Sequence, residues 1–206
     1  MKKVILAALF TSIGSSAFSD DVAIRYETID VNLSSGGVSV SGDGDGYSIS
    51  GTFDILDTGF VTTASFASGS GTIAGIDWSL DATSVGVGYK IIDQINEDSG
   101  LQLVAGVGYM SSAGDLTSGG TKYIMGADST ILLGQARAKT GESLSIAGEV
   151  ILDLEGESDP TFSVGLAYDV TENGSIDLGY SSNNTTSSAG VTSEITGWTV
   201  GYRISF

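Results

Sequence analysis

Few residues in this sequence could carry out enzyme chemistry. The 206 residues contain no His and no Cys. A Ser nucleophile is usually activated by a neighbouring His, so the common hydrolytic arrangements have no base here. Carboxylate-only and Ser–Lys chemistry stay open, but no spacing groups such residues together. We therefore predict that the protein is not an enzyme and has no catalytic residues and no cofactor.

Two acidic segments resemble sites for hard cations. Residues 42–46 read Gly-Asp-Gly-Asp-Gly, which is similar to a fragment of a calcium loop. Calcium takes six or more oxygen ligands, and this segment lacks a third acid and the closing Glu of an EF-hand. Residues 155–159 form a second acidic loop. We favour solvated acidic loops over a metal site, with Asp43 and Asp45 as the candidate ligands for divalent cations.

Charged residues also recur at alternate positions within apolar segments. They are Asp54, Lys90, Glu149, Asp153, Asp177 and Arg203, and Arg25 and Arg137 are candidates for the same set. If their shared face lines a narrow lumen, opposite charges should pair there, because isolated charges are unfavourable away from water. A paired network would plug the lumen. A hydrated lumen with an excess of carboxylates would instead favour cations. We favour a narrow or plugged lumen.

The first nineteen residues have the pattern of a secretory signal peptide. Lys2 and Lys3 precede the apolar run 4–10, and residues 17–19 read Ala-Phe-Ser, a small-x-small cleavage site before Asp20. The apolar run is shorter than the roughly 20 residues that a membrane helix needs. Removal of nineteen residues from the 206 leaves 187, the size of one domain. We expect an exported protein with one domain at residues 20–206.

The composition excludes several classes of protein. Losing Lys2 and Lys3 takes the formal net charge from −17 to −19, so the cationic surface that nucleic acid needs is absent. Without Cys, no disulfide holds this exported chain together. Hydrophobic residues make up 41%, too many for a disordered acidic chain, yet no segment after the leader is apolar enough for a membrane helix. The apolar content must be spread regularly, as in membrane β-strands.

Apolar and polar residues alternate with a period of two along most of the chain. This period indicates strands with one apolar face. We predict an all-β, antiparallel up-and-down transmembrane barrel with ten strands, or eight as the alternative. In the fourth strand the apolar phase changes near Ser84, which predicts a β-bulge there. The predicted strands span residues 22–33, 47–55, 60–68, 78–91, 101–109, 129–139, 144–153, 162–170, 176–180 and 196–206.

The connections and the aromatic residues support a membrane barrel. Short turns at 56–59, 92–99, 140–142 and 171–174 alternate with mostly longer polar segments at 34–46, 69–77, 111–128, 155–160 and 182–195, as in outer-membrane barrels. Aromatic residues gather near strand ends, where they would lie at the two membrane interfaces. One group is Phe60, Tyr89, Tyr168, Tyr202 and Phe206; the other is Tyr47, Phe66, Trp78, Tyr109, Phe162, Tyr180 and Trp198.

The last strand carries the most specific pattern, Trp198-x-x-x-Tyr202-x-Ile204-x-Phe206. With the leader and the alternating strands, it resembles bacterial outer-membrane β-barrel proteins, similar in size to OmpA-type and OmpX-type barrels or to a porin-like barrel. In that group a terminal aromatic residue, with hydrophobic residues at alternate positions before it, is read by the barrel-assembly machinery. The resemblance implies that Tyr202, Ile204 and Phe206 are this signal, and that the protein lies in outer-membrane lipid of a Gram-negative bacterium.

Three functions remain open at this level. The first is a structural or surface-interaction barrel with acidic extracellular loops and a narrow or plugged lumen. The second is a narrow, cation-preferring channel. The third is a secreted soluble β-sandwich or barrel, in which the apolar faces would form the core.

Overall fold

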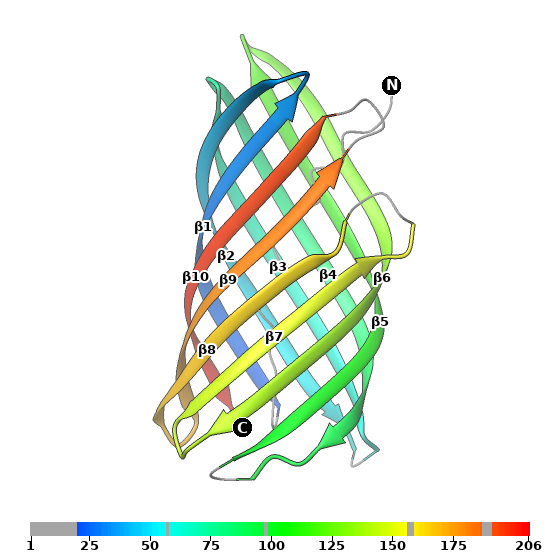
Figure 1. Cartoon of the computed structure of the whole chain (residues 1–206), viewed down its shortest axis with the longest axis vertical. Coiled ribbons are helices and arrows are strands. Elements are labelled where there is room, and N and C mark those ends of the chain that lie inside the picture. The colour runs from blue at the N-terminus through cyan, green and yellow to red at the C-terminus, as the bar shows by residue number, and fades with distance from the viewer. Residues whose placement is uncertain (1–19, 57, 97–98, 156–158, 187–190) are drawn as a thin grey trace.

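The computed structural model describes residues 20–206 apart from 57, 97–98, 156–158 and 187–190. The predicted signal peptide, residues 1–19, lies outside the described residues. No helix in the described part of the chain is long and apolar enough to cross a membrane. The strands are β1 (Asp21–Ser35), β2 (Val38–Ile55), β3 (Phe60–Ile73), β4 (Ile76–Asp93), β5 (Ser99–Ser118), β6 (Thr121–Thr140), β7 (Leu144–Asp153), β8 (Thr161–Thr171), β9 (Gly174–Thr186) and β10 (Thr192–Ser205) (Figure 1).

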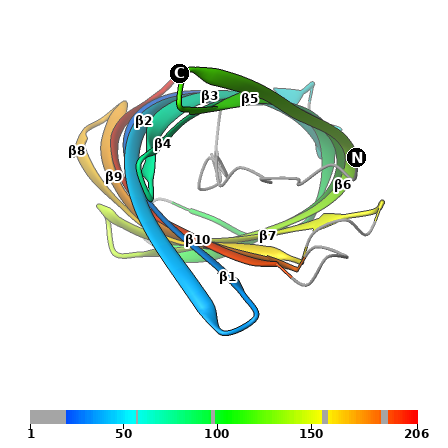
Figure 2. The ribbon, with the colours of Figure 1, turned by 90° about the horizontal axis from the view of Figure 1, so that it is seen from above.

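The ten strands form one closed antiparallel barrel. Each strand pairs with its neighbours in the sequence, and β10 pairs with β1 to close the ring (Figure 2). The closing ladder runs from Asp21 opposite Ser205 to Ser34 opposite Thr192, almost the whole length of β1. This confirms the predicted all-β up-and-down barrel and decides for ten strands over eight.

Side chains alternate between the outside and the lumen along most of each strand. In β10, Val200, Tyr202 and Ile204 are 43–49% exposed on the outer face, whereas Thr199 and Arg203 on the inner face are 6% and 4% exposed. β1 and β8 show the same alternation. A soluble barrel would bury its apolar face in the core, so an apolar outer face excludes the soluble alternative. The outer surface is apolar, as contact with lipid requires.

The two ends of the barrel differ. We call the end with the β1–β2, β3–β4, β5–β6, β7–β8 and β9–β10 connections the hairpin end, and the opposite end, where β1 starts and β10 finishes, the turn end. At the hairpin end the β1–β2 and β5–β6 hairpins reach far beyond the β7–β8 connection (Figure 1). The rim of the barrel is therefore uneven, with a tall wall over β1 to β6.

Most of the predicted long loops are strands that continue to tight turns. The segments 34–46, 69–77 and 111–128 form paired hairpin ends, and β9 and β10 also extend into 182–195. The turns are Gly36-Gly37, Ala74-Gly75 and Gly119-Gly120, all at φ between 51° and 83°, which suits two-residue hairpins. The prediction of loops was wrong because a sheet that stands in water needs no apolar face, so its strands have a loop-like composition.

The predicted bulge at Ser84 was also wrong. The β4–β5 register runs without a break past Ser84 and shifts only between Lys90 and Ile92. The change of phase has another cause. The apolar residues in 78–82 face the lumen, whereas those in 85–89 face the outside.

Apolar side chains therefore occupy the lumen toward the hairpin end. They form a buried cluster of Ile29, Val31, Ala67, Ile73, Trp78, Leu80, Ala82 and Ile195. β2 contributes Gly44 to the same face, where a Cβ would lie 2.4 Å from the Trp78 ring, so only glycine lets the indole approach this closely. We call this set the upper apolar core. It places Trp78, at 4% exposed, in the lumen and not in an aromatic belt.

The remaining aromatic residues fit two belts on the outer face. Three ring pairs have centroids 5.0–6.2 Å apart: Tyr47–Phe66, Tyr180–Trp198 and Phe60–Tyr89. The first two pairs lie toward the hairpin end of the apolar band and the third lies at the turn end. Amphipathic rings favour the two membrane interfaces, so the band between them is the part that lipid should cover.

Candidate functional site

The lumen near the turn end holds a buried group of paired charges. Asp177 on β9 lies between Arg25 on β1 and Arg203 on β10, and its Oδ2 is 2.9 Å from Arg25 Nη2 and 2.8 Å from Arg203 Nη2. All three side chains are at most 6% exposed. One carboxylate therefore accepts hydrogen bonds from two guanidinium groups, the arrangement expected where water is scarce.

A glycine makes this contact possible. Gly201 on β10 lies directly between Arg25 and Asp177 in the register of the three strands. A Cβ at position 201 would lie 2.4 Å from Arg25 Cγ. The missing side chain lets Arg25 cross β10 to reach the carboxylate on β9.

Further side chains extend the group across the lumen. Asp21 Oδ2 lies 3.6 Å from Arg203 Nε, and Arg25 Nη1 donates to Ser50 Oγ at 2.8 Å. From the other side, Arg137 on β6 donates to Ser145 Oγ on β7 at 3.2 Å. Residues of β1 and of β6 to β10 line a void of only about 10 Å³. We call Asp21, Arg25, Arg137, Asp177 and Arg203 the arginine layer.

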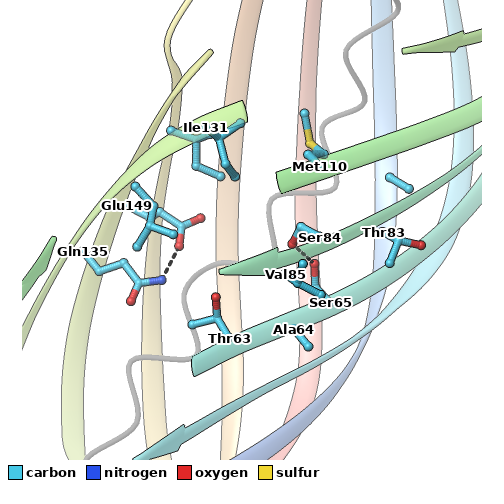
Figure 3. Close-up of a pocket in the computed structure, with 13 residues that line it drawn as sticks. Thr63, Ala64, Ser65, Thr83, Ser84, Val85, Met110, Ile131, Gln135 and Glu149 are labelled. Carbon is cyan, nitrogen blue, oxygen red and sulfur yellow. Dashed lines mark hydrogen bonds between the residues drawn. The ribbon is translucent and has the colours of Figure 1, made fainter. Parts of the chain in front are cut away.

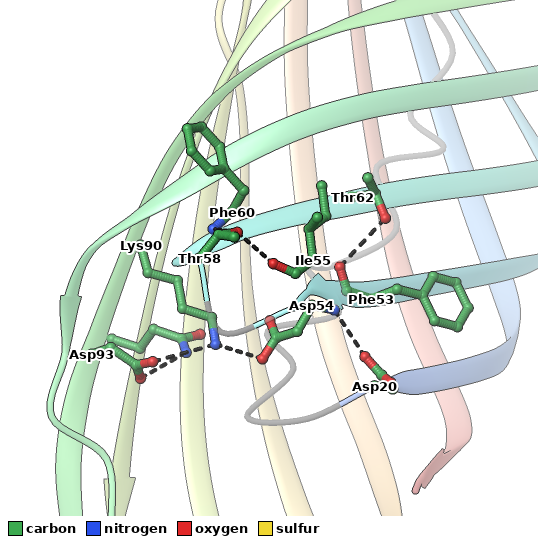
Figure 4. A network of polar contacts seen from close by, with 10 residues as sticks. Asp20, Phe53, Asp54, Ile55, Thr58, Phe60, Thr62, Lys90 and Asp93 are labelled. Atoms are coloured by element: carbon green, nitrogen blue, oxygen red, sulfur yellow. Dashed lines mark hydrogen bonds and ion pairs between the residues drawn. The ribbon is translucent and has the colours of Figure 1, made fainter.

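A second ionic network lies at the rim of the turn end. Lys90 Nζ on β4 is 2.8 Å from Asp54 Oδ2 on β2 and 3.3 Å from Asp93 Oδ2 (Figure 4). The Asp54 backbone N–H donates to Asp20 Oδ1 at 2.8 Å, and Gln102 Nε2 donates to Asp93 Oδ1 at 3.1 Å. This network joins the starts and ends of β1, β2, β4 and β5. Asp54 and Asp93 are 38% and 48% exposed, so solvent weakens these ion pairs.

The two remaining predicted lumen acids lie farther toward the hairpin end, on β7. Glu149 is 9% exposed and its Oε2 accepts a hydrogen bond from Gln135 Nε2 at 2.6 Å. Asp153 Oδ1 accepts one from Ser129 Oγ. A cavity of about 40 Å³ separates Glu149 from Ser65 and Ser84 on the facing wall (Figure 3). Among the described residues, no arginine forms an ion pair with Glu149, in contrast to Asp177.

Sequence reasoning missed two inward carboxylates on β1. Asp21 and Glu27 are 0% and 3% exposed, and the Oε1 atom of Glu27 is buried without a hydrogen-bond partner among the described residues. The alternation in β1 could have revealed them, because the odd-numbered residues Ala23 and Arg25 lie on the same inner face as both acids. Ile29 and Val31 lie on the same inner face but belong to the upper apolar core. This face therefore contains both charged and apolar residues, and its polar character could not be recognised from the sequence.

The comparisons with known proteins identify the architecture. No protein-family model and no curated protein matches the sequence. The transport unit of the autotransporter AIDA-I from Escherichia coli is 13% identical over 96% of this chain and 94% of that chain, with a TM-score of 0.53. The translocator domain of the autotransporter NalP from Neisseria meningitidis is 10% identical, over 94% and 91%, at 0.50. Neisserial surface protein A is 16% identical, over 90% and 97%, at 0.48. The chain has the fold of a bacterial outer-membrane β-barrel.

The last strand of this outer-membrane barrel presents the three residues of the expected assembly pattern to the outside. Tyr202, Ile204 and Phe206 are 43%, 49% and 67% exposed. The Phe206 backbone N–H donates to the Asp20 carbonyl at 3.0 Å, which extends the β1–β10 seam by one pair. Their side chains are thus free of contacts with the lumen.

The candidate metal ligands do not lie in a loop. Asp43 and Asp45 belong to β2 and point outward into solvent, with Asp43 directly opposite Asp30 on β1. The second acidic segment falls partly at 156–158, outside the described residues. Within the described part of the chain, no group of three or more acidic, His or Cys side chains could hold a metal ion.

Proposed function

We propose that this protein is an integral barrel of the outer membrane with a structural or surface-interaction role, and that its lumen does not conduct ions. The arginine layer carries the proposal. At this level, residues of β1 and of β6 to β10 line a void of about 10 Å³, room for roughly one water molecule. The upper apolar core occupies the lumen again toward the hairpin end. Two filled levels support a plugged barrel.

The surface that could meet partners is the tall wall at the hairpin end. Its outer face carries mainly Asp, Ser and Thr, and Lys122 Nζ pairs with Asp115 Oδ2 at 2.9 Å. Near the tip of the β5–β6 hairpin, Ile124 is 84% exposed and Tyr123 is 58% exposed. An acidic wall with exposed apolar side chains at one tip supports a surface-interaction role.

One observation favours the second candidate, a cation-preferring channel. The inner face carries more carboxylates than cationic groups. The carboxylates are Asp21, Glu27, Asp54, Asp93, Glu149, Asp153, Asp169 and Asp177, and the cationic groups are Arg25, Lys90, Arg137, Lys139 and Arg203. If water filled the lumen, this excess would attract cations and repel anions.

Single-channel recording in planar bilayers distinguishes a plugged barrel from a cation-preferring channel. The purified, folded barrel should produce no steps of ionic current if the arginine layer blocks the lumen as proposed. The matched positive control is a double variant, Arg25→Ser with Asp177→Ser, which shortens two of the five side chains of the layer and removes one charge of each sign. Steps in the double variant alone would support the plug. Cation-selective steps in the unaltered protein would overturn it in favour of the channel.

The same proposal includes no catalytic activity and no cofactor, since no His is present to activate a nucleophile. It also includes recognition of the last strand by the barrel-assembly machinery. The outward, solvent-accessible positions of Tyr202, Ile204 and Phe206 support that recognition.

A further inference from the structure

The tall wall at the hairpin end leaves one edge of the sheet open (Figure 1). β7 ends at Asp153, which pairs with Ile131, far from the tip of the β5–β6 hairpin. One further contact, from the Leu154 N–H to the Thr130 carbonyl at 2.9 Å, ends this side of the ladder. Within the described part of the chain, residues 121–129 of β6 have a neighbouring strand only on the β5 side. At about 3.3 Å per residue, the open edge is about 30 Å long.

The backbone groups on this edge point toward the missing neighbour. Along an antiparallel strand, the N–H and C=O groups of successive residues point to opposite sides in turn. The Thr130 carbonyl points toward the β7 side, so the alternate residues before it also direct their N–H and C=O groups to the open side. They are Lys122, Ile124, Gly126 and Asp128, all of them exposed. The edge therefore offers a row of donors and acceptors with which a further strand could pair.

The edge lacks the features that usually prevent strand pairing. Proline, a bulge or a very short strand are common protections of an edge. Residues 121–130 contain no proline, and the β5–β6 register runs without a shift along the whole ladder. The one lysine in this stretch, Lys122, pairs with Asp115. A long, regular edge of this kind is accessible to an incoming strand.

The edge lies in water, and its outer face is acidic. Thr130 is opposite Tyr109, one of the rings at the expected membrane interface, so residues 121–129 stand beyond the lipid. Asp128 lies on the outer face of the edge and Glu155 lies at its foot, and both are exposed. The whole chain has a formal net charge of −17. A second copy of the chain would be repelled from this edge, whereas a cationic segment would be attracted to it.

The inner face of the edge is apolar. Tyr123 lies opposite Leu116, which packs against the upper apolar core, and Ala127 follows on the same face. An added strand would place alternate side chains beside Tyr123 and Ala127 and the remaining ones on the outer face beside Asp128. The strand that matches both faces therefore alternates apolar and basic residues.

We propose that the open edge of β6 binds an extended segment of a partner protein in which apolar and basic residues alternate. The segment adds antiparallel to β6, in the position that a longer β7 would occupy. Backbone hydrogen bonds to the edge supply affinity, and the alternating side chains supply selectivity. This inference rests on the proposed surface-interaction role and names the site and the partner chemistry for it.

The test uses a short, fluorescein-labelled peptide of alternating valine and lysine. It is titrated with the folded barrel in non-ionic detergent, and binding is followed by fluorescence anisotropy. In antiparallel pairing, the peptide residues that hydrogen-bond to Ile124 and Gly126 also share their outer face, so they are the lysines. N-methylation of the lysine backbone nitrogens should weaken binding about tenfold or more, because it removes several of these hydrogen bonds.

The matched control peptide carries the methyl groups on the valine backbone nitrogens. These point away from β6, so this peptide should bind nearly as well as the unmodified one, although both methylated peptides have the same charge. Both are measured on the unaltered barrel, so the comparison does not depend on the folding of a variant. Equal affinities of the two methylated peptides would overturn the proposal, and so would a failure of the unmodified peptide to bind.

Variants of the barrel test the same edge from the other side. Ile124→Pro removes an open N–H without removing one from the β5–β6 ladder, so the unmodified peptide should bind several-fold more weakly. Ile124→Thr keeps that N–H and should bind normally. Asp128→Asn should also weaken binding, whereas Asp43→Asn, which removes an exposed acid from β2, should not. Undiminished binding to a folded Ile124→Pro barrel would contradict pairing at this edge.

Two further outcomes are distinguishable. Self-association of the unaltered barrel that Ile124→Pro abolishes would overturn the choice of partner in favour of a second copy of the chain. Failure of the peptide to bind would leave the proposed plugged lumen untouched, because single-channel recording tests the lumen independently of the edge.

Discussion

Single residues in the lumen differ chiefly in whether their charge is paired. Asp177 accepts hydrogen bonds from Arg25 and Arg203, and Gly201 makes room for one of these contacts. A buried ion pair contributes little net stability compared with apolar residues of the same size. Removing one partner is different, because the remaining charge stays buried without compensation. Asp177 therefore matters for stability mainly because it compensates the charges of two buried arginines.

Replacing Asp177 with alanine should strongly destabilise the barrel. Arg25 and Arg203 would lose their shared carboxylate, and breaking a buried pair in this way costs about 3–5 kcal/mol. The measurement is urea unfolding of barrel refolded in lipid vesicles. The matched control is Asp169→Ala, because Asp169 lies 4.0 Å from Lys139 and is 34% exposed. That variant should lose about 1 kcal/mol or less. An equally small loss in Asp177→Ala would show that water solvates the arginines and that the layer is not closed.

At the scale of elements, strand alternation predicted the lipid-facing side of the barrel and the ten-strand order. It depends only on period two, and outward residues such as Val200 and Ile204 follow it. The hairpin end was not predictable in the same way. There the strands stand in water, so Asp43 and Asp45 show a loop composition although they lie in β2. The composition of a segment indicates whether it faces water or lipid. It does not by itself show whether the backbone forms a hydrogen-bonded strand.

The contacts inside the lumen also required the closed register. Arg25 and Asp177 are 152 positions apart in the sequence, and they meet only because β1 and β9 both pair with β10. The sequence pattern could place both residues on inner faces but could not bring them together. The same limit applied to β4, where inward Trp78 and Leu80 had the appearance of a bulge. In a membrane barrel the apolar face of a strand usually points outward to lipid, so apolar residues that point into the lumen lead to the wrong assignment of the two faces.

The final strand supports a prediction about assembly. Deleting Phe206 should reduce insertion into the outer membrane, because the assembly machinery would lose the terminal aromatic residue. The same deletion should hardly affect refolding of the purified protein in detergent, because the Phe206 side chain is 67% exposed and its backbone adds one hydrogen bond to Asp20. The measurement is the amount of barrel in isolated outer membranes. Phe206→Tyr, which keeps an aromatic end, is the control. Normal insertion of the deleted form would contradict the role of Phe206.

For the molecule as a whole, stability comes from closure of the ring. An open sheet would leave the edges of β1 and β10 unpaired in lipid, where no water can replace the lost hydrogen bonds. The β1–β10 ladder removes both edges. The outer band meets lipid, while the upper apolar core and the arginine layer hold the inside, so unfolding one part of the ring exposes all of these surfaces together.

A closed ring of this kind should resist SDS until it is heated. Unheated and boiled samples of the folded protein should run at different positions on a gel, because the detergent cannot enter a ladder without edges. Val200→Pro should abolish the difference. Val200 points outward, so the lumen is untouched, but it pairs with Tyr26 and Leu178, and proline removes its N–H from the ladder. Val200→Thr keeps that N–H and should behave like the unaltered protein. Equal mobility of unheated and boiled samples of the unaltered protein would mean that the ring is not closed in the membrane.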